Sequence, residues 1–409
     1  MRRGVPGEGD HHGGGLKMAR YVGLSGDQAA AFAAKQCDVD VVAAYPITPQ
    51  TIIVEEFSNY VADGEVDTEF ICVESEHSAM SACIGASLTG ARVFTATSSQ
   101  GLALMHEMLY IASGGRCPIV LCNANRALSA PLNIHGDHSD MMGSRDCGWI
   151  QIYAENAQEV YDWTIQAFRI AEDEATQVPV AVNFDAFTIT HSLERLTVLE
   201  DEAVKSFVGK RKPKYTLDPH NPKTFGSAAL PNFYYEFRVQ LDDAIQRSFS
   251  TIRKVNDEYS KISGRSYDIV QAIGLEDADA AVLCLGGTIG TAKVVAKKLK
   301  SEGVNVAVIK PWVFRPFPSR ELLTALDKVS AIAVLDRAIS PGAPYGPLCS
   351  DIISTLYKYD REMCINNFIY GLGGRDISPR EMESVMRDTA RNAKEKKIEE
   401  SVTYIGVRE

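Results

Sequence analysis

Three short loops in this sequence carry side chains that bind or activate organic ligands. The first, Tyr45-Pro46-Ile47-Thr48-Pro49, follows the apolar run Val41–Ala44. Its two prolines fix the backbone on either side of Thr48 and present the threonine hydroxyl. A simple turn at the end of a strand is the alternative interpretation. Ligands of open parallel sheets bind at the carboxyl ends of the strands, where this loop is expected to lie.

The second loop, Glu74-Ser75-Glu76-His77, follows the apolar run Phe70–Val73. It leads into a helix of mostly small residues at 78–86, and small side chains let another group approach closely. A carboxylate at a helix start interacts favourably with the helix dipole, so a solvated or capping role for Glu76 is the alternative to a role in chemistry.

The third loop places Asn125-Arg126 after the apolar run Ile119–Asn123. The planar guanidinium of arginine binds a carboxylate through two parallel N–H groups. A surface ion pair of little energetic value is the alternative for Arg126, and spacing alone does not separate the two interpretations.

A glycine-rich loop, Leu285–Gly290, follows another apolar run and opens a predicted helix. Its glycines favour either an anion site at the helix N-terminus or a tight strand-to-helix turn. The sequence lacks the phosphate-binding Gly-x-x-x-x-Gly-Lys-Ser/Thr loop, the Gly-x-Ser-x-Gly nucleophile elbow and the His-Glu-x-x-His zinc motif. No metal site is predicted on this chain.

Composition narrows the class of protein. The chain has 409 residues, 45% of them apolar and 23% charged, which is typical of a globular protein of two or three domains. A net charge of −11 disfavours nucleic acid or an anionic membrane as the main partner. No apolar run is long enough to span a membrane. Residues 1–17 lack the apolar segment of a secretory signal and are expected to be a disordered extension, with Met18 as an alternative start.

Cysteine usage points to a cytoplasmic location. The nine cysteines are odd in number, and no two are spaced as Cys-x-x-Cys. A disulfide framework and a local zinc or iron–sulfur site are therefore not expected. Cysteines in apolar runs, such as Cys122 and Cys284, are expected to be small buried hydrophobic residues.

Alternating strand and helix patterns predict an α/β fold with two doubly wound domains. The first domain spans residues 18–200, and its predicted strands are Val41–Ala44, Phe70–Val73, Arg92–Ala96, Ile119–Asn123 and Pro179–Phe184. Its clearest predicted helix is Ala157–Ala175. Residues 201–270 read as a long connector, which is rich in lysine and proline and then forms a helix at about Phe233–Ser263.

The alternation resumes in a second domain at residues 271–409. Its predicted strands are Ala280–Leu285, Val304–Ile309, Ala331–Leu335 and Asn367–Ile369. Its predicted helices are Thr288–Glu302, Ser319–Leu326, Pro347–Lys358 and a charged tail at Pro379–Glu400.

An ordered set of motifs resembles a known family. The motifs are Tyr45–Pro49, Glu76 before its small-residue helix, Thr95–Gly101, Asn125–Pro131, Gly136–Asp140, Gly148–Gln151 and Tyr370–Asp376. In this order, and over essentially the whole chain from Met18, they resemble the alpha subunit of pyruvate:ferredoxin oxidoreductase (pyruvate synthase), a 2-oxoacid:ferredoxin oxidoreductase. The resemblance implies that residues 18–200 are a pyrimidine-binding domain and that residues 271–409 are a transketolase C-terminal-like domain.

The resemblance also implies roles for the loop residues. Thiamine diphosphate would lie between this chain and a beta subunit, with Glu76 on the pyrimidine ring nitrogen beside Pro46 and Ile47. Proton sharing with Glu76 would let the cofactor form its reactive carbanion. Arg126 would orient the carboxylate of the 2-oxo acid and Thr48 would hydrogen-bond its oxygens.

Partner subunits would carry the remaining machinery. The resemblance implies that a beta subunit holds the diphosphate and Mg²⁺ through a Gly-Asp-Gly motif, which this sequence lacks. Iron–sulfur clusters would lie on ferredoxin-like gamma and delta subunits, with coenzyme A as co-substrate and ferredoxin as electron acceptor. Pyruvate is the expected substrate because Thr48 is small and neutral. The alternatives are 2-oxoisovalerate, 2-oxoglutarate, oxalate, or a non-catalytic assembly subunit.

Overall fold

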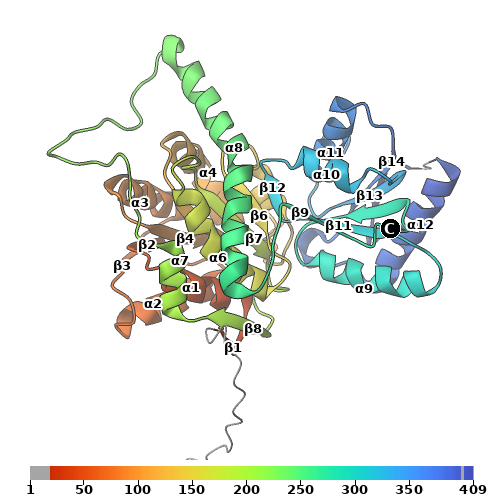
Figure 1. Ribbon diagram of the computed structural model, residues 1–409, viewed down its shortest axis with the longest axis horizontal. Helices are drawn as coiled ribbons and strands as arrows, with labels where there is room; N and C mark the ends of the chain where they lie inside the picture. Colours follow the sequence, from red (N-terminus) through yellow and green to blue (C-terminus); the bar gives the residue numbers. More distant parts are fainter. Residues whose placement is uncertain (1–18, 398–399, 409) are drawn as a thin grey trace, which may run out of the picture.

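The computed structural model describes residues 19–397 and 400–408 and arranges them as two α/β units side by side (Figure 1). The predicted extension at residues 1–17 lies outside the described residues. Within the described ranges, no helix combines the length and the apolarity needed to cross a membrane.

A seven-stranded sheet forms the centre of the first unit. All its neighbouring strands run parallel except β12, which is antiparallel to β6. In sheet order, the strands are β12 (Val313–Arg315), β6 (Ile150–Tyr153), β7 (Val180–Asp185), β5 (Ile119–Asn125), β4 (Val93–Thr97), β2 (Val41–Ala44) and β3 (Glu69–Cys72). The predicted α/β class with a largely parallel sheet is confirmed.

Helices cover both faces of this sheet. One face packs against α1 (Gly26–Gln36), α2 (Thr51–Ala62) and α6 (Ala157–Glu172). The other face packs against α3 (Glu76–Thr89), α4 (Ser99–Gly114) and the short α5 (Ser139–Gly143). A small antiparallel pair, β1 (Ala19–Leu24) and β8 (Glu194–Leu199), lies outside the main sheet.

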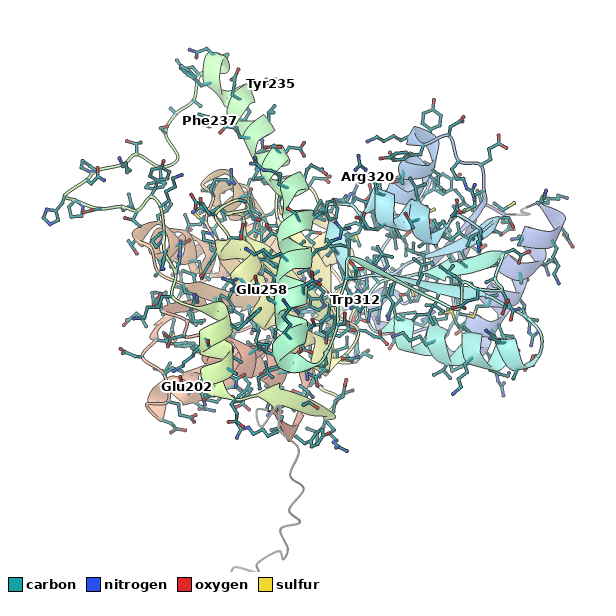
Figure 2. The ribbon with its side chains drawn as sticks, viewed as in Figure 1. Glu202, Tyr235, Phe237, Glu258, Trp312 and Arg320 are labelled. Atoms are coloured by element: carbon teal, nitrogen blue, oxygen red, sulfur yellow. The ribbon has the colours of Figure 1, made fainter. Side chains whose placement is uncertain are left out.

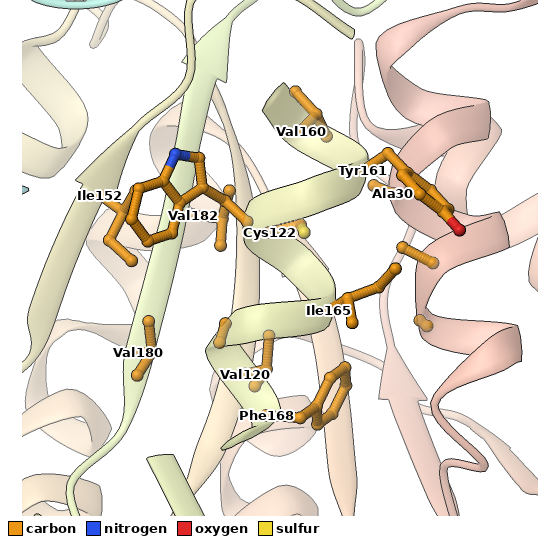
Figure 3. Close-up of a cluster of buried hydrophobic side chains, with 14 of the residues drawn as sticks. Ala30, Val120, Cys122, Ile152, Val160, Tyr161, Ile165, Phe168, Val180 and Val182 are labelled. Carbon is orange, nitrogen blue, oxygen red and sulfur yellow. The ribbon is translucent and has the colours of Figure 1, made fainter. Parts of the chain in front are cut away.

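Helix α6 is the centre of the first core. The side chain of Asn156 caps its start by accepting a hydrogen bond from the Glu159 amide at 2.9 Å. Val160 and Phe168 belong to the buried core of this unit, and α6 lies between the strands and α1 (Figure 3). The helix ends at Glu172 because the next residue adopts an extended backbone, three residues before the predicted end.

The second unit has a six-stranded sheet that is parallel except for β9. In sheet order, its strands are β15 (Val402–Tyr404), β14 (Cys364–Ile369), β13 (Ala331–Asp336), β10 (Ala280–Leu283), β11 (Ala307–Pro311) and β9 (Val270–Ile273). Helices α9 (Thr288–Ser301) and α12 (Pro379–Glu395) pack on one face. Helices α10 (Ser319–Ala325) and α11 (Pro347–Lys358) pack on the other.

Along the chain, three segments connect the first unit to the second. They are α7 (Asp201–Val208), a long strap and the 33-residue helix α8 (Pro231–Ser263). Buried residues of α8 begin only at Leu241, and near its end the helix packs against α6, where Tyr259 donates a hydrogen bond to Asp162 at 2.5 Å. The first ten residues extend beyond the body of the molecule, and Tyr235 and Phe237 lie on this projecting end (Figures 1 and 2). Gly264 ends the helix with a φ of 69°, a left-handed conformation that favours glycine.

A strand and buried ion pairs join the two units in addition to the connector. Strand β12 follows β11 of the second sheet, yet it completes the edge of the first sheet beside β6. Close to this junction, the side chain of Lys310 is buried in ion pairs with Glu155 and Glu159 of the first unit. The units are therefore joined by a shared sheet and by buried charge pairs.

Candidate functional site

The predicted site residues lie along one edge of the first sheet. Thr48 follows β2, Glu76 follows β3 and Arg126 follows β5. These strands are parallel and are arranged in the order β5-β4-β2-β3, so their carboxyl ends lie at the same edge.

The Thr48 loop is exposed but firmly anchored. Buried Gln50 donates hydrogen bonds from Nε2 to the carbonyls of Tyr45, at 3.1 Å, and Ala96, at 2.8 Å. Pro46 and Thr48 are exposed, and Ile47 is half-buried. Among the described residues, none bonds to the Thr48 hydroxyl, whereas its carbonyl accepts a hydrogen bond from Arg126 Nη1 at 2.7 Å. The loop therefore both presents a hydroxyl and holds the neighbouring guanidinium.

Arg126 has a buried guanidinium with no acidic hydrogen-bond partner among the described residues. It is only 6% exposed, and burial lowers the pKa of its guanidinium while nearby Asp140 opposes this shift. Nε donates to the Asn133 carbonyl at 3.1 Å and Nη1 to the Thr48 carbonyl. No carboxylate within the described ranges forms an ion pair with Arg126. Two carbonyls thus fix the guanidinium, and Nη2 remains available to an anion.

Glu76 is a buried carboxylate in the first turn of α3, whose start Ser75 caps through the Ser78 amide at 3.2 Å. It is 6% exposed and has no hydrogen-bond or ion-pair partner in the part of the chain that the structure describes. Its side chain lies against Gly101, where an added Cβ would be 2.6 Å from Glu76 Oε1 and 2.5 Å from Thr97 Oγ1. Gly101 therefore leaves the space that Glu76 occupies.

Asp140 connects the Arg126 loop to the start of α4 through hydrogen bonds. Its carboxylate accepts hydrogen bonds from the amides of Ser99 and Arg126, both at 3.0 Å, and from Asn125 Nδ2 at 2.9 Å. Complete burial raises the pKa of Asp140, and these donors oppose the shift. Sequence reasoning included Asp140 only as part of a motif, because nothing in its spacing shows that it bonds to residues 14 and 41 positions away.

The glycine loop at Gly286 and Gly287 does hold an anion, but the anion is internal. The Gly287 amide donates to Asp185 Oδ2 at 2.7 Å, and a Cβ on Gly286 would be 2.9 Å from the same oxygen. Asp185 also contacts His138 at 2.7 Å and Arg337 at 3.2 Å. Of the two alternatives that the sequence left open, the structure favours the tight strand-to-helix turn, because a carboxylate of the first unit occupies the place of an external anion.

Glu76 and Arg126 suit ligands that offer an anionic group to the arginine and an N–H or proton-sharing nitrogen to the glutamate. Burying an ionised group is costly unless it is paired, and the described residues pair neither Glu76 nor Arg126. A bound anion would satisfy Arg126, and an N–H donor or a ring nitrogen that shares a proton would satisfy Glu76. The structure joins Arg126 to Thr48 directly, but it shows no hydrogen bond from Glu76 to either residue.

The residues fit the pyrimidine half of thiamine diphosphate. Glu76 supplies a carboxylate for the ring nitrogen, and the clearance at Gly101 lets it adopt its position beside Thr97. The Gly-Asp-Gly motif that the resemblance assigns to diphosphate and Mg²⁺ binding does not occur in this sequence. Residues 19–397 and 400–408 contain no cluster of three histidine, cysteine, aspartate or glutamate side chains that could hold a metal ion.

Two protein families match this chain. A family described as pyruvate flavodoxin/ferredoxin oxidoreductase, thiamine diphosphate-binding, matches residues 32–257. A second, described as pyruvate:ferredoxin oxidoreductase core domain II, matches residues 278–382. These two matches cover most of both α/β units.

The chain is also similar to known proteins over nearly the full length of both sequences. The chain is 48% identical to pyruvate synthase subunit PorA of Methanocaldococcus jannaschii, over 94% of this chain and 98% of that protein. It is 44% identical to ketoisovalerate oxidoreductase subunit VorA of Pyrococcus horikoshii, over 93% and 96%.

A solved structure shares the fold. It is a 2-oxoglutarate:ferredoxin oxidoreductase from Magnetococcus marinus, with a TM-score of 0.71 at 18% identity, covering 90% of this chain and 65% of that one. The family match over residues 32–257 and the full-length relatives show that the chain belongs to the pyruvate flavodoxin/ferredoxin oxidoreductase family.

Proposed function

We propose that this chain is the alpha subunit of a thiamine-diphosphate-dependent pyruvate:ferredoxin oxidoreductase. The observation that carries the proposal is Arg126, a buried guanidinium held by the carbonyls of Thr48 and Asn133, with no carboxylate partner among the described residues. The carboxylate of a small 2-oxo acid is the partner that it lacks. The exposed hydroxyl of Thr48 is placed to donate to an oxygen of the same substrate.

Glu76 is proposed to hold the pyrimidine ring of the cofactor, next to Pro46 and Ile47. Thiamine diphosphate supplies a carbon nucleophile and a sink for the electrons released by decarboxylation. The part of this chain is to share a proton between the Glu76 carboxyl group and the pyrimidine ring nitrogen. Aspartate would be one carbon too short, and glutamine cannot exchange the proton.

The complete reaction needs other subunits. Pyruvate loses carbon dioxide, its acyl carbon forms a bond to the sulfur of coenzyme A, and the thiol proton is released. The two electrons released would be carried to ferredoxin by iron–sulfur clusters of partner subunits. We assign the diphosphate and Mg²⁺ to a beta subunit and the clusters to ferredoxin-like gamma and delta subunits, because this sequence lacks Gly-Asp-Gly and Cys-x-x-Cys motifs.

A second 2-oxo acid is a specific alternative, since a relative named for ketoisovalerate is nearly as similar as one named for pyruvate. Thr48 is small and neutral, which favours a short monocarboxylate over 2-oxoglutarate. Oxalate is also a carboxylate that Arg126 would accept. Catalytic efficiencies of the assembled enzyme for all four acids separate these cases. Activity with none of them would indicate a non-catalytic assembly subunit.

Arg126→Lys in the assembled enzyme tests the proposal. Lysine keeps the charge but loses the planar pair of N–H groups, so the substrate carboxylate is held with less angular control. We expect kcat/KM for pyruvate to fall by about 10²-fold. Thiamine diphosphate affinity, measured by calorimetry, should remain close to that of the parent.

Arg145→Lys is the matched control, because Arg145 pairs at 3.8 Å with exposed Asp146. Its kinetics should equal those of the parent enzyme. Unchanged pyruvate kinetics in Arg126→Lys would remove Arg126 from the substrate site.

A further inference from the structure

A glycine turn of the second unit lies against the loop that holds Arg126. The turn spans Gly371 to Gly374 and includes the single 3-10 turn η1 (Leu372–Gly374). Gly373 donates its amide to Asp137 Oδ2 at 3.0 Å and accepts from Asn133 Nδ2 at 3.0 Å. Gly374 donates to the Gly136 carbonyl at 2.8 Å. Three hydrogen bonds thus join a distant part of the chain to the segment between β5 and α5.

The approach is so close that only glycine fits. A Cβ on Gly373 would be 2.2 Å from Asn133 Nδ2, and one on Gly374 would be 2.4 Å from His135 Cβ. Both glycines also have positive φ, of 59° and 81°, where other residues are strained. Any side chain in the turn would therefore have to displace Asn133 or His135.

Asn133 connects this turn to the guanidinium. Its side chain is held on both sides, since Oδ1 accepts from the His135 amide at 2.7 Å while Nδ2 donates to Gly373. Its main-chain carbonyl accepts from Arg126 Nε. Movement of the Asn133 side chain would therefore move the acceptor that sets the plane of the Arg126 guanidinium.

We propose that the Gly371–Gly374 turn and Asn133 form a positioning device for the substrate-binding arginine, an inference that rests on the proposed function of Arg126. The second α/β unit then contributes to substrate binding without touching substrate. Asn133 is a positioning residue: it acts only through the direction in which Arg126 presents its free N–H groups.

A double-mutant cycle in the assembled enzyme tests the connection. Asn133→Ala removes the clamped side chain, and we expect kcat/KM for pyruvate to fall about tenfold, mainly through KM, because a misdirected guanidinium binds the carboxylate less well. In an Arg126→Lys background the same change should have little further effect, because residues that act through one another are not additive. Binding of oxamate, a non-reacting carboxylate, measured by calorimetry should weaken in parallel.

The outcomes separate this proposal from the proposed function. If Asn133→Ala costs the same factor in both backgrounds, the positioning role is overturned while Arg126 keeps its assignment. If Arg126→Lys itself leaves pyruvate kinetics and oxamate binding unchanged, the proposed function of Arg126 and this inference fail together.

Gly373→Ala provides a second, independent measurement. Its Cβ would push Asn133 aside, so KM for pyruvate should rise, and the rise should shrink in an Asn133→Ala background that makes room for the methyl group. Gly303→Ala is the matched control, since Gly303 also has a positive φ, of 80°, but has no atom within 4 Å of the added Cβ. An equal rise in KM for both variants would show a general effect of backbone strain and overturn the proposal.

Discussion

At the level of single residues, the proposed chemistry depends on a proton shared by Glu76. In the assembled enzyme with cofactor bound, Glu76→Gln keeps the shape of the side chain but cannot exchange that proton. We expect deuterium exchange at the thiazolium carbon to fall by about 10²–10⁴-fold, the range for general acid–base groups. This measurement requires neither ferredoxin nor coenzyme A.

Glu74→Gln is the control for that change, because Glu74 is exposed and lies in the same loop. If Glu76 were only a helix-start residue, its replacement would cost a few tenths of a kcal/mol and leave exchange unaltered. Parent-like exchange in Glu76→Gln, with cofactor bound, would refute the assignment.

Gly101 gives a second test of the same site from a residue that carries no functional group. A methyl group at this position would be 2.6 Å from Glu76 Oε1 and 2.5 Å from Thr97 Oγ1, so Gly101→Ala should displace the carboxylate. We expect slower exchange at the thiazolium carbon and weaker cofactor binding by calorimetry. Gly114→Ala, on the same helix but with open space around the added atom, should behave like the parent.

The sequence singled out Thr48, Glu76 and Arg126 because each follows an apolar run, and the carboxyl ends of parallel strands share one edge. What it did not reveal is how these residues are held. The carbonyls that fix Arg126 belong to Thr48 and Asn133, and backbone acceptors have no signature in residue type. The space beside Glu76 comes from Gly101, a contact that depends on helix packing.

At the level of elements, most strands inside the two main sheets were predictable, and most of those at sheet edges or outside the main sheets were not. Continuous apolar runs identified β2, β4, β5, β7, β10 and β13 to within two residues at each end. The strands β1, β6, β8, β9, β12 and β15 were missed. Most are at sheet edges or in the small outlying pair, where pairing partners rather than composition decide the structure.

The strap before α8 has almost no secondary structure of its own. Residues 209–230 contain only an isolated bridge, Asp218–Asn221, and Lys214 and Lys223 are exposed. We therefore expect that, within residues 19–397, limited trypsin digestion cuts first after Lys214 or Lys223. Mass spectrometry of the early fragments checks this.

Both fragments should then stay together on size-exclusion chromatography, because α8 packs against α6 and α4, which lie in the other fragment. A double variant, Lys214→Gln with Lys223→Gln, should slow the first cut. Early cleavage at Lys293 on α9, ahead of the strap, would contradict the expected order.

At the level of the whole molecule, Asp185 links the two units. Burial alone would raise its pKa, but Arg337 and His138 lower the pKa well below the usual range. Asp185→Asn leaves Arg337 buried without that partner, and we expect a loss of about 3–5 kcal/mol in the free energy of unfolding by urea. Asp376→Asn, which removes an exposed partner of the same arginine, should cost less than about 1 kcal/mol.

The same carboxylate gives a pH dependence with a defined sign. Since the pKa of Asp185 is lower in the folded state, its stabilising contribution is complete above about pH 4, the ordinary range for aspartate, and declines as the pH falls toward the folded-state pKa. The difference in stability between the parent and Asp185→Asn should therefore shrink below about pH 4. A difference that stays constant on acidification would mean that Asp185 is not ionised in the folded protein.

Strand β12 has a consequence for how this chain can be divided. The turn after Gly264 separates α8 from β9, and it looks like a natural place to break the gene in two. A polypeptide ending there would have an uncovered edge at β6, and the downstream polypeptide would carry β12 with no strand of its own sheet to pair with. Splitting the gene at this turn therefore yields two polypeptides that must be co-expressed, because the first sheet is complete only when β12 of one pairs with β6 of the other.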